Sequence, residues 1–581
     1  MFKGKLASYL KIKSSIHIYI YSILIGILVG LSTILFSFVI HYFENLIFHQ
    51  TGFKSSESSK SDFYFLIVFI PALGGFFSAL TTQFFCPEAK GNGTDEIIKS
   101  FHYKGGYIPL RVPFFKSIAT IFTIGTGGSA GKEGPTMQIG AGIGSSIANL
   151  FRGGDRARRS LMIAGVAGGL GAIFKIPFGG AFTAIEVVYK EDLESDTIVP
   201  AFLSSITAYL VSINFTEKTS LLTIPEVGIH HLYELFFYFI LGFVCLLFGY
   251  IFTKLYTYTK TLFENLKIPF IWKPTIGGLL VGFFLLFFSD LRGDGIVFLQ
   301  KIIKSISEIQ EDYLFLSFYF LVIALLKMVL TSFTVGSGGS GGLFVPSLFI
   351  GGMLGLSFGS LTKHFFPNLE LSLINFFLIG MSGFFTGIAH APIAGMLMVC
   401  DVIENYTLLP ALIIVSVVNT VFSKWSIYQG QIENRFHSPA HYWDMNFNIL
   451  KRIKIQEIEH KIRKTAVVEP HLLLSDLEDR SLRLKETDFI VVSSEGYYKG
   501  ICSLKKFHHS KETESLIYLL TVDDVYDASV PPLSLQNSLS DVLKIMHEKE
   551  VDKVAIIDNQ SYLRGYIRFL DIIQTYFTVA K

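Results

Sequence analysis

The sequence GGSAGKEGP at residues 127–135 returns in outline as GGSGGLFVP at residues 338–346, 211 positions further along the chain. The register continues downstream, where IG at residues 139–140 corresponds to IG at residues 350–351. Gly-rich segments can resemble one another by chance, but a register shared over about twenty positions favours an internal repeat. We therefore expect a chain built from two related halves.

A second pair of matching segments follows the first. PFGG at residues 177–180 corresponds to PIAG at residues 392–395. An acid comes six residues after the last Gly of the first segment and of the second, Glu186 and Asp401. Interrupted apolar segments at corresponding places in two halves indicate the substrate site of a membrane transporter.

The composition around these segments is that of a membrane protein. The 581 residues are 50% hydrophobic and only 17% charged, with a mean hydropathy of +0.49, whereas soluble domains are about a quarter charged. Uncharged runs long enough for a bilayer core of about 30 Å are Ile18–Ile40, Phe63–Cys86, Thr197–Thr216, Leu235–Thr253 and Tyr406–Ser423. We expect residues 1–441 to form a multi-span membrane domain, with repeat halves at about 15–215 and 230–435.

The rest of the composition excludes several classes of function. The net charge of +2 gives no indication of nucleic-acid binding. The four cysteines are scattered without a CxxC pair, so neither a zinc site nor a disulfide framework is predicted. No nucleophile–base pair or metal-ligand set stands out, so we predict neither an enzyme nor a cofactor. Lysines before the first apolar run favour a cytoplasmic N-terminus.

Three uncharged or nearly uncharged stretches are too long for one crossing and are broken by Gly and Pro: 117–149, Met328–Thr362 and Leu371–Cys400. Each unpaired backbone group in lipid costs several kcal/mol, so such breaks persist only around protein or a polar cavity. We expect broken or re-entrant helices around a polar site. A helix N-terminus binds an anion without a full positive charge, and conduction needs binding weak enough to release the ion. The two Gly-rich loops are therefore candidate anion cradles.

Glu133 is the exception within these loops, because its counterpart in the second half is Phe344. An acid inside a membrane segment is a functional candidate by default. Its carboxylate can take the place of an anion and leave when protonated, which would make a pH-sensitive gate. The alternative role is a structural helix cap stabilised by the helix dipole.

GKEGP at residues 131–135 and GLFVP at residues 342–346 resemble the GKEGP and GxFxP signatures of the CLC family of chloride channels and chloride/proton exchangers. GNGTDE at residues 91–96 stands where that family carries its GSGIP-like element, and SIY at residues 426–428 resembles the segment with the pore tyrosine. The resemblance covers about residues 15–435. It implies an all-α inverted-repeat membrane domain and a homodimer with a separate chloride path in each subunit.

The resemblance also implies roles for individual residues. Glu133 takes the position of the gating glutamate. The implied anion-binding positions are the amides around Lys132, Glu133 and Gly134 for an outer site, and the amides of Leu343, Phe344 and Val345 with the Tyr428 hydroxyl for a central site.

Asn92 stands where the family usually has Ser, and Thr94-Asp95 replaces Ile-Pro. An Asn amide can still donate a hydrogen bond to an anion, so we expect Asn92 to bind it, while the selectivity among chloride, nitrate and similar anions stays open. Asp95 near an anion path is unfavourable unless its carboxylate faces a helix N-terminus or water.

Val187 departs from the family pattern at a position that bears on proton coupling. Aligned from Pro177, Glu186-Val187 stands where proton-coupled family members commonly have Glu-Glu, so the proton-relay position falls on a valine. Valine carries no proton, although Glu186 lies next to it. We therefore favour a channel or uncoupled conductor. A chloride/proton antiporter and a membrane sensor without transport are the alternatives.

Residues 442–581 are charged and soluble in character, and they predict a small α/β module of two related copies at about 455–510 and 522–578. They resemble the paired CBS modules of many CLC proteins, which often bind adenine nucleotides through a Ser or Thr and an acid three positions on. One copy keeps Ser503 but has Lys506, and the other keeps Asp571 but has Arg568. Neither pattern is complete, so a structural or dimerising role stands beside nucleotide binding. The resemblance implies a cytoplasmic module, with the protein in the cell membrane.

Overall fold

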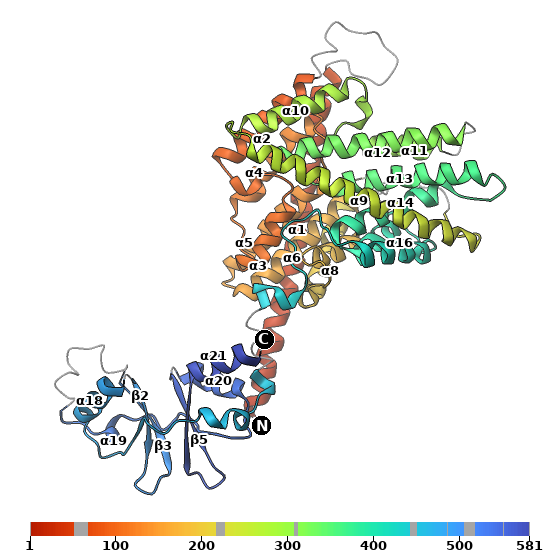
Figure 1. Ribbon diagram of the computed structural model, residues 1–581. Helices are drawn as coiled ribbons and strands as arrows, with labels where there is room; N and C mark the ends of the chain where they lie inside the picture. Colours follow the sequence, from red (N-terminus) through yellow and green to blue (C-terminus); the bar gives the residue numbers. More distant parts are fainter. Residues whose placement is uncertain are drawn as a thin grey trace. The chain divides into compact units, whose positions relative to one another are not determined.

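The computed structural model describes residues 2–50, 68–216, 227–306, 312–441, 450–484, 486–504, 518–549 and 551–579. The chain divides into two compact units, Met1–Ala440 and His441–Lys581. Within the described residues, the larger unit is helical and the strands lie in the smaller unit (Figure 1).

The helices of the larger unit follow one another along the chain. They are α1 (Phe2–Gln50), α2 (Phe69–Phe84), α3 (Thr94–Tyr103), α4 (Arg111–Gly125), α5 (Glu133–Leu150), α6 (Asp155–Phe174), α7 (Pro177–Glu186), α8 (Ile198–Phe215), α9 (Tyr233–Asn265), α10 (Trp272–Leu285), α11 (Ile296–Ser305), α12 (Tyr313–Gly336), α13 (Phe344–Phe365), α14 (Leu373–Ala389), α15 (Pro392–Ile403) and α16 (Leu409–Phe422).

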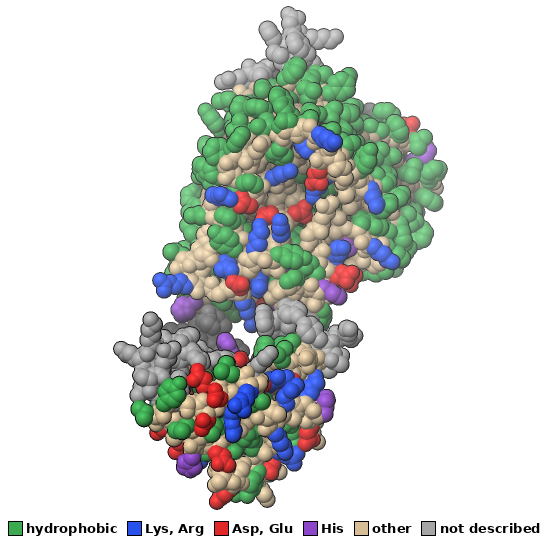
Figure 2. Space-filling view, turned by 60° about the vertical axis from the view of Figure 1, so that its left-hand side comes forward, with side chains coloured by type: hydrophobic (Ala, Val, Ile, Leu, Met, Phe, Trp, Pro, Cys, Tyr) green, Lys and Arg blue, Asp and Glu red, His purple; other side chains and the backbone are tan. Residues whose placement is uncertain are grey.

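Five helices of the described residues are long and apolar enough to cross a membrane. They lie at Ile16–Phe48, Ser195–Phe215, Tyr233–Asn265, Tyr313–Gly336 and Phe344–Phe365. Large apolar side chains cover the outside of such helices, including Leu35 and Phe38. Figure 2 shows hydrophobic side chains over much of this unit, with charged side chains gathered around a hollow. An apolar exterior of this extent suits a lipid environment, and the protein is an integral, multi-pass membrane protein.

The internal repeat appears in the packing of helices. Helices α5 and α6 cross at Gly140 and Gly165, where a Cβ on either glycine would come within 3.0 Å of the carbonyl oxygen of the other. Helices α13 and α14 cross in the same way at Gly351 and Gly380. Small residues let membrane helices approach closely and pack backbone against backbone, so glycines at matching positions give the two halves the same helix crossing.

The smaller unit contains two three-stranded sheets of identical topology, with strand orders β1-β2-β3 and β4-β5-β6. In each sheet the first pair of strands is parallel and the second is antiparallel. Its elements are β1 (Val467–Val468), α18 (Leu474–Leu484), β2 (Asp488–Val492), β3 (Tyr498–Ser503), α19 (Val522–Val525), β4 (Leu533–Ser534), α20 (Leu539–Lys549), β5 (Lys553–Ile557), β6 (Leu563–Arg568) and α21 (Phe569–Val579). This architecture confirms the predicted small α/β region.

Candidate anion site

The two Gly-rich loops face one another as a pair. The Gly131 amide donates to the Gly342 carbonyl at 2.9 Å, and the Gly342 amide donates to the Gly131 carbonyl at 2.7 Å. Side chains support the pairing in matching ways. The Ser129 hydroxyl lies 3.0 Å from that of Thr331. The corresponding hydroxyls of Ser340 and Thr120 are also 3.0 Å apart. The sequence repeat therefore forms one site from both halves.

Glycine is required at particular points of this site. Gly127 and Gly338 have φ angles of 94° and 105°, in the left-handed region that favours glycine. A Cβ on Gly131 would come within 3.0 Å of the Glu133 carboxylate, and one on Gly342 would meet the same carboxylate and the Gly134 amide. The loops are glycine-rich because the Glu133 carboxylate occupies the space between them.

Glu133 begins helix α5 in one half but is bonded to the other half. Its side chain is fully buried, and its Oε1 accepts hydrogen bonds from the amides of Phe344 at 2.6 Å and Val345 at 3.1 Å. These amides lie in the first turn of α13, where the helix has unpaired donors and a positive dipole end. Among the described residues, Oε2 has no hydrogen-bond partner. The carboxylate thus occupies the amide donors at the N-terminus of α13.

Lys132 precedes Glu133, and its Nζ lies 3.3 Å from Oδ2 of Asp294. The adjacent Gly134 packs against the second loop, because a Cβ there would meet the Gly342 backbone and the Asn92 carbonyl. Leu343 immediately precedes α13, at its N-cap position. The structure therefore brings together the predicted residues of both cradles.

Asn92 has a partner that the sequence did not indicate. Its side-chain amide donates to the Asp95 carboxylate at 3.1 Å, and its Oδ1 accepts from the Asp95 amide at 3.1 Å. Asp95 lies in the first turn of α3, which fulfils the condition under which an acid is tolerated there. The Asn92 amide that was expected to bind an anion is engaged by this carboxylate.

Asn92 and Asp95 also line a pocket of about 470 Å³. Tyr256 and four lysines, Lys90, Lys99, Lys260 and Lys273, contribute to the same pocket. Tyr428 is 3% exposed, and its hydroxyl interacts with Thr94, the first residue of α3. The predicted tyrosine therefore lies beside the helix terminus that carries Asn92.

Two fully buried lysines brace the site, and the sequence reading did not identify them. The Lys116 ammonium donates to the carbonyls of Ala89 at 3.0 Å and Gly91 at 2.7 Å. The Lys327 ammonium lies 211 positions later and donates to the carbonyls of Leu291 at 3.0 Å and Gly293 at 2.9 Å. Their spacing equals the repeat offset, which is the signal that would have revealed them.

Glu186 and Asp401 cap helices in a reciprocal arrangement. The Glu186 carboxylate accepts from the amides of Ile393 at 3.2 Å and Ala394 at 2.8 Å, in the first turn of α15. The Asp401 carboxylate accepts from the first turn of α7, from Phe178 at 3.0 Å and Gly179 at 2.8 Å. Each half of the repeat therefore caps a short helix of the other half.

Val187 follows Glu186 and is buried at 1% exposure. Its carbonyl accepts a hydrogen bond from the Gln431 side-chain amide at 2.9 Å. The position offers no titratable side chain, and the neighbouring Glu186 is bonded to α15.

In the smaller unit, the two nucleotide-binding candidates have partners within the chain. The Ser503 hydroxyl donates to Asp488 at 2.6 Å. Asp571 accepts from the Arg568 guanidinium at 3.1 Å and lies 3.5 Å from that of Arg463. Burial acts to raise the pKa of Asp571, but the hydrogen bonds and charge of Arg568 outweigh it and hold that pKa below its usual value. Lys506 lies outside the described residues.

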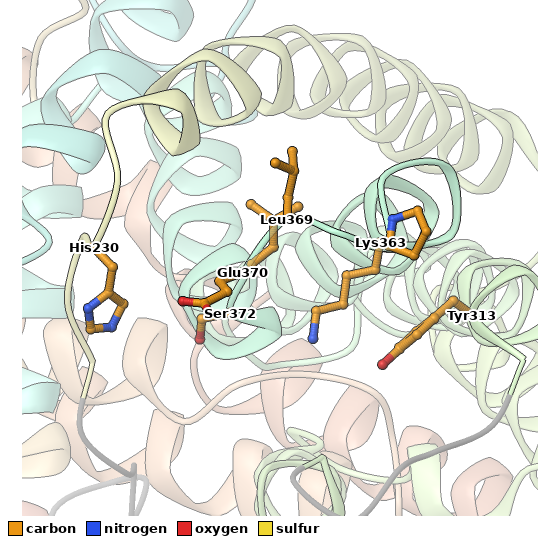
Figure 3. A pocket seen from close by; sticks show the side chains of 8 residues that line it. His230, Tyr313, Lys363, Leu369, Glu370 and Ser372 are labelled. Atoms are coloured by element: carbon orange, nitrogen blue, oxygen red, sulfur yellow. The ribbon is translucent and has the colours of Figure 1, made fainter.

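A separate pocket of about 320 Å³ lies at the ends of α12 and α13 (Figure 3). Tyr313 and Lys363 reach into it from one side, and His230 and Glu370 line the other. None of its lining residues belongs to the paired loops or to their bracing lysines, so it is not part of the candidate anion site.

Helices that meet at their N-termini around a buried acid, within a repeated multi-span unit, define a membrane transport protein for anions. The model of the family described as voltage gated chloride channel matches residues 74–424. The chain belongs to this family, the CLC family of chloride transport proteins.

Relatives support this assignment over most of the chain. The H(+)/Cl(-) exchange transporter ClcA of Vibrio cholerae serotype O1 is 30% identical over 430 residues, which cover 71% of this chain and 88% of that protein. An uncharacterized protein of Methanocaldococcus jannaschii is 31% identical over 384 residues, covering 65% and 86% of the two chains.

Solved structures share the fold. A slow cyanobacterial Cl-/H+ antiporter matches with a TM-score of 0.62 and 20% identity, over 71% of this chain and 96% of that one. A eukaryotic CLC transporter matches with a TM-score of 0.57 and 16% identity, over 96% of this chain and 98% of that one. The second likeness extends through both units of the chain.

Proposed function

We propose that this protein carries chloride along a path gated by Glu133, with one path in each subunit of a homodimer, and that transport is not obligatorily coupled to protons. The observation that carries the gate is the pair of hydrogen bonds from the Phe344 and Val345 amides to the Glu133 carboxylate. The same amides can bind chloride once the carboxylate leaves, since both are anions that accept from N–H donors.

The gate responds to protons and to chloride for one physical reason. A protonated carboxyl group loses the charge that holds it against the N-terminus of α13, and chloride competes for the same donors. Binding by backbone dipoles is favourable but weak enough for release, as conduction requires. Tyr428 beside Thr94 would supply a hydroxyl donor to the central part of the path, and Asn92 would do so after exchanging its bond to Asp95.

The absence of obligatory coupling rests on Val187 and Glu186. Val187 has no group that can carry a proton at the position where exchangers hold an acid. Both carboxylate oxygens of Glu186 accept amide hydrogen bonds from α15, so its structural role accounts for its presence. We assign Glu186 to helix capping.

An antiporter is the second candidate, and the names of the relatives favour it. ClcA, about 30% identical to this chain, is described as an exchanger of protons and chloride. An exchanger would need a proton route that does not use an acid at position 187.

Simultaneous measurement of chloride and proton fluxes in proteoliposomes tests the proposal. With a chloride gradient and no proton gradient, we expect chloride flux without uphill proton movement. Protons driven uphill by chloride would establish the antiporter and contradict uncoupled transport. A preparation that passes no anion would support a sensor without transport.

For the smaller unit we propose a cytoplasmic, structural role, with the N-terminus on the same side of the membrane. The basis is the engagement of Ser503 by Asp488 and of Asp571 by Arg568. These bonds occupy the groups that a nucleotide would need.

A further inference from the structure

The repeat relates two loops that are each bonded to one of the paired cradles: the Gly341 amide donates to the Gly91 carbonyl, and the Gly293 amide donates to the Gly127 carbonyl. One loop precedes α3 and the other precedes α11, and a buried lysine binds the carbonyls of each. Backbone angles agree as well: φ is 69° at Gly91 and 61° at Gly293, and 82° at Gly93 and 86° at Gly295. By this correspondence, Asp294 in the second half occupies the position of Asn92 in the first.

Neighbouring side chains extend the correspondence. The Lys90 ammonium lies 4.2 Å from the ring centroid of Phe270, and the Arg292 guanidinium lies 4.5 Å from that of Phe48. Each cation precedes the Asn or Asp position by two residues. The two loops are thus equivalent in backbone and in their cationic side chains, and they differ in charge at one position.

Asp294, the residue that differs in charge, pairs with the residue that precedes Glu133. Asp294 Oδ2 lies 3.3 Å from Nζ of Lys132, the residue immediately before Glu133. The side chains are 12% and 22% exposed, respectively, so solvent screens their interaction less than it would on an open surface. Asp294 Oδ1 also accepts from the Ile296 amide at 3.1 Å, which fixes the carboxylate at the start of α11.

The other charges around this pair are balanced. Glu44 of α1 interacts with both Lys132 and Asp294, and Arg292 and His41 lie within reach of Glu44. Glu133 also interacts with Lys132, and the buried Lys327 interacts with Asp294. Three acids (Glu44, Glu133 and Asp294) and three basic side chains (Lys132, Lys327 and Arg292) therefore meet at this end of the path. Removing one charge leaves an uncompensated charge of the opposite sign next to the site where an anion binds.

We propose that Asp294 is a positioning residue that holds and neutralises Lys132, and so sets how tightly the path binds its anion beside Glu133. This inference rests on the proposed function. A free ammonium there would strengthen anion binding and slow release, whereas a free carboxylate would repel the anion. A unit charge at this range in a partly buried site changes affinity by about tenfold.

Chloride binding to the purified full chain, measured by calorimetry in a Glu133→Gln background, tests the inference because no carboxylate then competes for the cradle. We expect Asp294→Asn to lower the chloride Kd about tenfold and Lys132→Gln to raise it by a similar factor. The double variant should return close to the Glu133→Gln parent, since both charges are gone. Lys132→Arg keeps the cation and should leave the Kd within about twofold.

Asp290→Asn is the matched control, because Asp290 lies on the same connection but pairs with Lys301 at 3.1 Å on an exposed surface. It should leave the Kd unchanged. The inference is overturned if Asp294→Asn has no effect, if it shifts the Kd in the same direction as Lys132→Gln, or if Asp290→Asn has the same effect. Should Asp294→Asn fail to fold, the two Lys132 variants still decide: Lys132→Gln should raise the chloride Kd and Lys132→Arg should not, and equal effects of the two would overturn the inference. A parent that binds no chloride, together with a wild-type protein that passes none, would instead contradict the proposed function.

Discussion

Glu133 is held by two backbone amides, and in the proposed gate a chloride ion uses the same donors when the carboxylate leaves. The carboxylate is covalently tied to the chain, so it competes at high effective concentration, and only protonation or displacement removes it. The site therefore needs no lysine or arginine in contact with the anion. At the residue scale, the steric constraint falls on the space around this carboxylate, which a Cβ on Gly131 or Gly342 would enter.

Gly131→Ala tests that space. Gly131 has no positive φ angle that excludes alanine, but a Cβ there would come within 3.0 Å of the Glu133 carboxylate. We expect the carboxylate to be displaced from α13, so that chloride flux at neutral pH rises severalfold towards that of Glu133→Gln. Proteoliposome chloride efflux measures this change.

In a Glu133→Ala background, Gly131→Ala should add nothing, since the carboxylate it displaces is absent. A similar change in both backgrounds would show that the alanine acts on the loop itself and not through Glu133.

At the scale of elements, short helices are joined across the repeat by acids. Glu186 and Asp401 each satisfy two amides at the start of a helix in the opposite half. A carboxylate at a helix N-terminus stabilises it through hydrogen bonds and the helix dipole.

Glu186→Gln should therefore lower stability by about 1–2 kcal/mol, read as a lower thermal midpoint of the detergent-solubilised protein. The ratio of proton to chloride flux should stay unchanged, because Glu186 is not a relay in this account. Asp401→Asn is the matched variant and should have a similar thermal effect. A loss of proton movement with Glu186→Gln at unchanged stability would assign Glu186 to proton transfer.

Some of these features could be predicted from the sequence and others could not. The fixed register of the repeat predicted both loops and the acids that follow the second pair of segments, because glycine and proline mark backbone constraints directly. It did not reveal Lys116 and Lys327, although the nearly uncharged run 117–149 and the uncharged run Met328–Thr362 begin immediately after them. The sequence alone does not show that such a lysine is buried, because the carbonyl groups that accept its hydrogen bonds are known only from the structure.

The hydrogen-bond partner of Asn92 could not be predicted from the sequence for a related reason. An amide three residues before an acid can cap a helix or bind a ligand, and local sequence does not decide between them. In the smaller unit, the sequence predicts strands at Tyr498–Ser503 and Lys553–Ile557, and β3 and β5 have these bounds. The two-residue strands β1 and β4 were not predicted, since they exist only through pairing with β2 and β5.

At the scale of the whole molecule, the smaller unit carries its own charge network. Arg568 and Arg463 neutralise Asp571, and the Lys553 ammonium donates to the Asp488 carbonyl at 2.7 Å across the two copies. These contacts place protein groups where a ligand would need free donors and acceptors.

We expect ATP at millimolar concentration to leave the thermal midpoint of the full chain unchanged, because a ligand stabilises only the state that it binds. Arg568→Thr restores the pattern of Thr with an acid three positions on and frees Asp571, so ATP should raise the midpoint of that variant. An upward shift of several degrees in the wild-type protein would contradict a purely structural role.

The central claim is that the Glu133 carboxylate occupies the anion path and leaves it on protonation. Initial chloride efflux from proteoliposomes, compared from about pH 5 to pH 8 for the wild-type protein and Glu133→Gln, tests it most directly. We predict that wild-type flux rises as the pH falls and that Glu133→Gln flux is high and independent of pH. A Glu133→Gln variant whose flux depends on pH as steeply as that of the wild-type protein would contradict the claim.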